Sequence, residues 1–191
     1  MYQHILLAVA LQRWDEFSSH AVAARQAAVA LARGAGAPLT VLSVYDYEDE
    51  TPEALSLAPE ALGLSVEDRA RARDAQIQRT DALMAAKMQA FLAGVPAGEI
   101  PVTPLLKVGH PRQVIVATAE ALGVDCVVIG AHSKRSFLDV LLGGTATMVS
   151  RRAPCAVVMV QPGEQRPLVQ TSEVGQPRQA PSQEDLPDGV R

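Results

Sequence analysis

Short apolar runs alternate along the chain with longer segments in which apolar residues recur every three or four positions. The runs cover residues 4–10, 39–45, 102–108, 126–129 and 156–160, and they are rich in Val, Leu and Ile. Such runs are typical of strands that are buried on both faces of a parallel sheet. Pro104 lies in the third run, and because proline donates no ladder hydrogen bond, it predicts an edge strand or a position that needs no such bond.

The intervening segments predict helices over about residues 18–33, 67–94, 111–122 and 144–152. In the first, a stripe of mostly small residues at helical spacing is expected to face the core: Val22, Ala23, Gln26, Ala27, Ala30 and Leu31. In the second, one face collects larger apolar side chains that we expect to fill the core: Ile77, Met84, Met88, Phe91 and Val95. The alternation of strands and helices predicts an α/β fold, a single doubly wound parallel sheet with right-handed crossovers.

Two segments interrupt this alternation. Residues 46–65 begin with an acidic stretch and contain Pro52 and Pro59, so we expect an irregular connection that is either functional or simply solvated. Residues 162–191 contain five prolines and no aromatic residue. They are expected to form a disordered tail without a core of its own, which leaves residues 1–161 as the folded domain.

Composition excludes several classes of function. The formal net charge of −4 and the pI near 5.6 argue against nucleic-acid binding, which usually requires a basic surface. No apolar run is long enough for insertion into a membrane, and the N-terminal residues lack the pattern of a signal peptide, so we expect a cytoplasmic protein. Cys126 and Cys155 both lie in or beside predicted strands; buried inert thiols are expected, with a redox pair as the alternative.

The strand at 126–129 stops at Gly130, and a polar loop leads to Gly143, Gly144 and Thr145 at the start of a helix. Glycines allow backbone N–H groups to approach an anion, and a helix start adds unpaired donors. Plain turn chemistry is the alternative, since short glycine motifs are common. Ligands of doubly wound sheets bind at the carboxyl ends of the strands, where both the Gly130 loop and the segment after Ala10 are expected.

Four segments carry a resemblance to a known family: MYQHILLAVA, LTVLSVYD, VGHPRQVIVATAEALGVDCVVIGAHS and LLGGTATMVSRRAPCAVVMV. In this order and spacing, residues 1–160 resemble the universal stress protein family. The resemblance implies a Rossmann-like, adenine-nucleotide-hydrolase-like fold, with five parallel strands in the order 3-2-1-4-5. It also implies homodimers, often formed through the last strand, here Ala156–Val160. One branch of the family binds ATP through the motif Gly-x2-Gly-x9-Gly-(Ser/Thr), and another branch lacks the motif and does not bind ATP.

This chain matches the motif only in part. Gly130 and Gly143 have the spacing of the first and third glycines, whereas Ser133 replaces the second glycine. Gly144 stands where Ser or Thr is expected, and Thr145 follows one position late. Nucleotide-binding members usually carry an Asp at the end of the first strand, where this chain has Ala10. Ala10 removes an acceptor, and Gly144 removes a hydroxyl donor for which Thr145 could compensate. Ser133 adds strain only if its φ is positive, and otherwise its hydroxyl could donate to a phosphate. Lys134 and Arg135 either restore phosphate attraction or form an exposed basic loop. Together the departures imply weakened nucleotide binding.

The sequence therefore predicts a nucleotide-binding regulatory protein of the stress response, with ATP or AMP as the ligand and Mg²⁺ accompanying ATP. The predicted nucleotide-binding residues come from two strand ends and the glycine loop: Ala8, Val9, Ala10, Val44, Gly130, His132, Ser133, Gly143, Gly144 and Thr145. The alternative is a dimeric protein that has lost nucleotide binding and acts through protein partners. An enzyme is not expected, because the chain has no P-loop, no supported Ser-His-Asp arrangement and no metal cluster among His4, His20, His110 and His132; the resemblance leaves slow ATP hydrolysis open.

Overall fold

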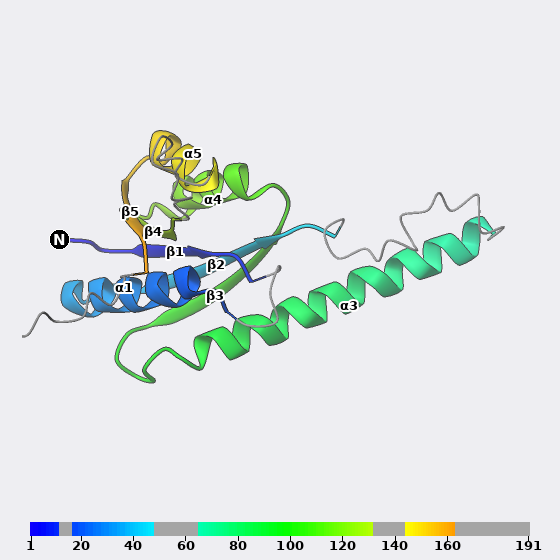
Figure 1. The fold of residues 1–191 in the computed structure, drawn as a ribbon, viewed down its shortest axis with the longest axis horizontal. Coiled ribbons are helices and arrows are strands. Elements are labelled where there is room, and N and C mark those ends of the chain that lie inside the picture. Colours follow the sequence, from blue (N-terminus) through cyan, green and yellow to red (C-terminus); the bar gives the residue numbers. More distant parts are fainter. Residues whose placement is uncertain (12–16, 48–64, 132–143, 163–191) are drawn as a thin grey trace, which may run out of the picture.

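Five parallel strands form one sheet at the centre of the protein (Figure 1). The computed structural model describes residues 1–11, 17–47, 65–131 and 144–162. The strands are β1 (Ile5–Val9), β2 (Leu39–Tyr45), β3 (Val102–Val108), β4 (Cys126–Gly130) and β5 (Ala156–Val160). Their order is β3-β2-β1-β4-β5, which confirms the predicted topology. Pro104 lies on the edge strand β3, opposite Val41 of β2, as its missing N–H predicted.

Helices cover both faces of the sheet. On one face, α1 (Ser19–Ala35) and α3 (Val66–Leu92) close a core around Ile5, Leu7 and Val41. On the other face, α4 (Pro111–Leu122) and α5 (Gly144–Arg152) pack over Leu6, Leu42 and Val127. Figure 1 shows these two layers, with α4 and α5 together on one side of the strands and α1 on the other. All five residues of β1 are buried, because this strand is central and covered on both faces.

The buried face of α1 differs from the predicted stripe. The residues of α1 that are buried are Ala21, Ala24, Ala28, Val29 and Ala32, whereas Gln26 and Ala30 are exposed. The prediction holds for Ala27 and Leu31, which are partly buried against the core, and is wrong for Gln26 and Ala30. Alanine recurs around the whole helix, so apolar spacing alone leaves the facing direction undetermined. Small side chains on the true face let α1 pack closely against the sheet.

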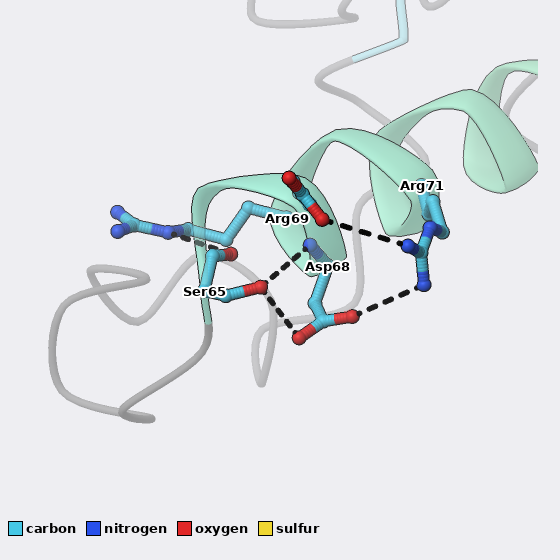
Figure 2. A network of polar contacts seen from close by, with 5 residues as sticks. Ser65, Asp68, Arg69 and Arg71 are labelled. Carbon is cyan, nitrogen blue, oxygen red and sulfur yellow. Dashed lines mark hydrogen bonds and ion pairs between the residues drawn. The ribbon is translucent and has the colours of Figure 1, made fainter.

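The helix α3 is half core and half solvent-exposed. Met84, Met88 and Phe91 are buried, as predicted, together with Thr80. No residue from Val66 to Arg79 is buried, and Figure 1 shows this half extending beyond the sheet. Local interactions maintain the helix there: Ser65 accepts from the Asp68 N–H at 3.1 Å, and Arg71 pairs with Asp68 at 3.4 Å (Figure 2). Such caps and pairs stabilise a helix that lacks tertiary contacts.

The two cysteines do not form a disulfide. Cys126 is buried in the core beneath α1 and α3, and Cys155 packs against the opposite core. Burial raises the pKa of the Cys126 thiol, which lowers its reactivity and fits the expectation of an inert core residue. Among the helices of the described ranges, none combines the length and apolar character needed to cross a membrane.

Several predicted features lie outside the described residues. These are most of the acidic connection, at 48–64, the loop and apolar turn at 132–143, and the tail from 163 to 191. The connection, loop and tail therefore stay as sequence-based predictions.

Candidate functional site

A pocket of about 630 Å³ opens at the carboxyl ends of the three central strands. Its lining comes from the ends of β1, β2 and β4 and from the first turns of α1, α4 and α5. From the centre of the sheet, β2 and β3 follow β1 towards one edge, and β4 and β5 follow one another towards the other edge. Ligands of doubly wound sheets bind where this direction changes, between β1 and β4. The volume lies within the range of small-molecule sites, about 300–1,000 Å³.

Seven of the ten predicted nucleotide-binding residues line this one pocket. They are Ala8, Val9, Ala10, Val44, Gly130, Gly144 and Thr145. The other three, His132, Ser133 and Gly143, lie outside the described residues. Segments that are more than one hundred residues apart in the sequence thus meet at one site, since parallel strands place all their carboxyl ends at the same edge of the sheet.

The inner wall of the pocket is apolar. Leu42, Ile115 and Ile129 line it together with Ala8 and Val44, and all five belong to the core beneath α4 and α5. The pocket therefore extends the core outward and offers an apolar surface to a flat or aliphatic group.

Polar and charged residues that the sequence analysis did not select complete the lining. They are Ser18, His20, Asp46, His110 and Arg112. Asp46 directly follows β2, so the rule of strand ends would have identified it. The residues at the starts of α1 and α4 are harder to find, because their position depends on how each helix crosses the sheet.

Gly130 is explained by packing between β4 and α1. A Cβ at this position would lie 3.0 Å from the backbone oxygen of His20 and 3.2 Å from its Cβ. Gly130 has no positive φ, so the close approach of α1, and not an unusual backbone conformation, requires the glycine. This contact brings the first turn of α1 to the rim of the pocket.

The first turn of α4 has no side-chain cap, and since Pro111 has no N–H and the Gln113 N–H donates to the His110 carbonyl at 3.0 Å, the Arg112 N–H is the donor that this turn offers. His110 is the N-cap residue, but its side chain makes no capping hydrogen bond, and Pro111 follows as the first helical residue. By contrast, the Ser18 hydroxyl caps α1 by accepting from the Ala21 N–H at 3.2 Å. The start of α4 is therefore suited to a negatively charged ligand group.

A pair of tyrosines fixes the end of β2 beside the pocket. The hydroxyl groups of Tyr45 and Tyr47 both donate to Oδ1 of Asp81 on α3, at 2.6 and 3.0 Å. Their rings contact each other edge to face, with centroids 5.8 Å apart. Burial, followed by the hydrogen bond to Asp81, raises the pKa of Tyr45 above its ordinary value. Because side chains alternate along a strand, this tyrosine clamp leaves Val44 and Asp46 on the pocket side.

The described residues contain no group of three or more His, Cys, Asp and Glu side chains that could hold a metal ion. The pocket lining instead combines one carboxylate, Asp46, with the cation Arg112 and two histidines. Among these groups, Arg112 and the uncapped start of α4 are suited to an anionic ligand group.

The sheet order and the pocket at its switch point define a doubly wound α/β protein with a small-molecule crevice. Within this class, the chain belongs to the universal stress protein family, whose family profile matches residues 1–161.

Individual relatives agree with this assignment. A universal stress protein of Thermus aquaticus is 29% identical over 161 residues, covering 84% of this chain and all of that protein (100%). Universal stress protein MJ0577 of Methanocaldococcus jannaschii is 33% identical over 60 residues, which is 31% of this chain and 37% of that protein. The solved structure of universal stress protein UspA from Lactobacillus plantarum is similar with a TM-score of 0.52 and 25% identity, over 83% of this chain and 97% of that one.

Proposed function

We propose that this member of the universal stress protein family is a cytoplasmic regulatory protein that binds an adenine nucleotide, ATP or AMP. The observation that carries the proposal is the meeting of seven predicted nucleotide-binding residues in one pocket of about 630 Å³. The resemblance to the ATP-binding branch of the family supplies the ligand class. The pocket supplies an apolar wall for a base and a cationic, donor-rich side for phosphates.

In this proposal the nucleotide lies across the carboxyl ends of the strands. The adenine faces the backbone near Val44, and the ribose and phosphates face Gly130, Gly144 and Thr145. Mg²⁺ would enter only with the phosphates of ATP. Ala10 provides no carboxylate for the sugar, so we expect an affinity about one to three decades weaker than a complete motif would give.

The proposal is tested by isothermal titration of the purified protein with ATP and AMP, with and without Mg²⁺, after removal of co-purified nucleotide. Ala10 is exposed and lines the pocket, so Ala10→Trp fills the site without disturbing the core. The matched control is Leu83→Trp, at a position of α3 that is 41% exposed and outside the pocket. We expect micromolar binding that Ala10→Trp abolishes and Leu83→Trp retains.

If titration of the wild-type protein at high concentration gave no heat of binding with ATP or AMP, nucleotide binding would be overturned. The second candidate function, a protein that acts through protein partners, would then stand on the departures at Ala10 and Gly144. We also propose binding without rapid turnover. A phosphate-release assay checks this, and ATP turnover on the seconds timescale would contradict it.

We propose further that the protein forms homodimers through β5. This strand is an edge of the sheet, and it carries half-buried Val157, Val158 and Val160 beside Met159, which is 38% exposed. Unpaired apolar edges favour association with another strand. Analytical ultracentrifugation should show a dimer that Met159→Lys dissociates, whereas Leu122→Lys, at an equally exposed position of α4, should remain dimeric. A monomeric wild-type protein would refute this assembly.

A further inference from the structure

Gly144 creates space that a neighbouring side chain occupies. It is the first residue of α5, and a helical backbone suits any L-residue, so its conformation does not require glycine. A Cβ added there would meet the guanidinium group of Arg112, and the three nearest atoms all belong to that group. Glycine at position 144 thus allows the Arg112 side chain, from the start of α4, to lie against the start of α5.

Arg112 brings a positive charge to the pocket from a different element. Its side chain lines the cavity together with Gly144 and Thr145. Within the described parts of the chain, no carboxylate forms an ion pair with Arg112, although Asp46 lines the same pocket. A guanidinium group without a carboxylate partner, at the side of a cavity, is suited to binding a phosphate through two parallel N–H···O bonds.

We propose that Arg112 binds a phosphate group of the nucleotide in place of the side-chain hydroxyl that the family motif carries at position 144. The substitution of Gly for Ser or Thr is then an exchange of one phosphate ligand for another, and not only a loss. The proposal rests on the nucleotide-binding function proposed above. It makes Arg112 the residue that selects phosphorylated nucleotides over the bare nucleoside.

The test compares ATP with adenosine by calorimetric titration of wild type, Arg112→Ala and Arg112→Lys. We expect Arg112→Ala to weaken ATP binding about tenfold or more, the effect of losing a hydrogen-bonded charge, while adenosine binding is unchanged. Arg112→Lys should retain part of the affinity, because a single ammonium replaces the planar two-pronged contact. Arg73→Ala is the matched control, an exposed arginine of α3 outside the pocket, and should bind both ligands as wild type does.

A double-mutant cycle tests the role of Gly144. Gly144→Ala displaces the flexible end of Arg112 and should weaken ATP binding, whereas in the Arg112→Ala background the same substitution should cost nothing further. The inference is overturned if Arg112→Ala binds ATP as wild type does, or if ATP and adenosine weaken equally. Wild-type protein that binds neither ligand would instead overturn the proposed function, and this inference with it.

Discussion

The tyrosine clamp offers a direct test of how strongly the end of β2, beside the pocket, is attached to α3. Tyr45→Phe removes one hydroxyl from the clamp and leaves every ring contact in place. Tyr45 is 6% exposed, and its hydroxyl donates to Asp81 at 2.6 Å. Tyr47→Phe is the matched comparison, since the half-buried Tyr47 donates to the same oxygen at 3.0 Å.

A hydrogen bond to a charged group contributes about 1.5–3 kcal/mol, and a neutral one about 0.5–1.5 kcal/mol. Asp81 is half-buried, and in either variant its Oδ1 still accepts a hydrogen bond from the remaining tyrosine. Solvent and this remaining bond therefore offset part of the loss. We therefore expect Tyr45→Phe to lower the free energy of unfolding by about 1–2 kcal/mol and Tyr47→Phe by about 0.5–1 kcal/mol. For a domain of this size, the larger change corresponds to a fall in Tm of about 2–8 °C.

Urea unfolding followed by circular dichroism measures both variants. A raised Tyr45 pKa means that the folded state keeps its proton while the unfolded chain ionises, so stability falls as the pH rises above the ordinary tyrosine value near 10. Tyr45→Phe should weaken this alkaline loss, because only Tyr47 then titrates in the clamp. The reasoning is refuted if Tyr45→Phe matches wild type within about 0.3 kcal/mol, or if Tyr47→Phe proves the more damaging change.

Three further outcomes are expected. Phe91→Ala, at a fully buried position of α3 (0% exposed), should cost about 3–5 kcal/mol in urea unfolding; a loss below about 1 kcal/mol would contradict the burial. Ala10→Asp should restore the family's carboxylate and tighten nucleotide binding about tenfold in calorimetry, and unchanged affinity would place the sugar elsewhere. Asp125 accepts from the backbone N–H groups of Gln3 and His4, which lowers its pKa. The stability that the Asp125 carboxylate contributes is present above the ordinary pKa range of carboxyl groups and is lost as the pH falls below it. The Tm difference between wild type and Asp125→Asn should therefore vanish in acid. A difference that stays constant with pH would exclude an ionic origin.

The secondary structure was largely predictable from the sequence because strands and helices here obey strong local rules. Pro111 and Gly123 mark the two ends of α4, and continuous apolar runs mark strands that are covered on both faces. The facing direction of α1 was not predictable, since a helix rich in alanine carries little contrast between its faces. The helix α3 was predicted over nearly its full length, but the exposure of its first half was not, because a cap and ion pairs stabilise that half without a buried stripe.

The candidate site was predictable at strand ends and at the glycine motif. Ala10 and Gly130 were found because parallel strands bring their carboxyl ends together, and Gly144 and Thr145 were found through the motif of the family that the chain resembles. Arg112 was missed because it follows β3, an edge strand, and the sequence alone does not show that the next helix begins beside the central strands. The helix α4 connects β3 at one edge to β4 on the other side of β1, so its first turn passes over the pocket. Only the topology of this crossover shows that Arg112 lies there.

The two motif glycines of the described site have different physical roles, which changes what the degenerate motif means. Gly130 allows α1 to approach β4, a contact that the fold needs with or without a ligand. Gly144 admits the guanidinium group of Arg112 into the pocket. A direct comparison with the motif counts Gly130 as retained function and Gly144 as lost function. The contacts show that packing against α1 already requires Gly130, so its presence alone is weak evidence for a ligand. They also show that Gly144 leaves room for Arg112, the residue that we propose as a phosphate ligand.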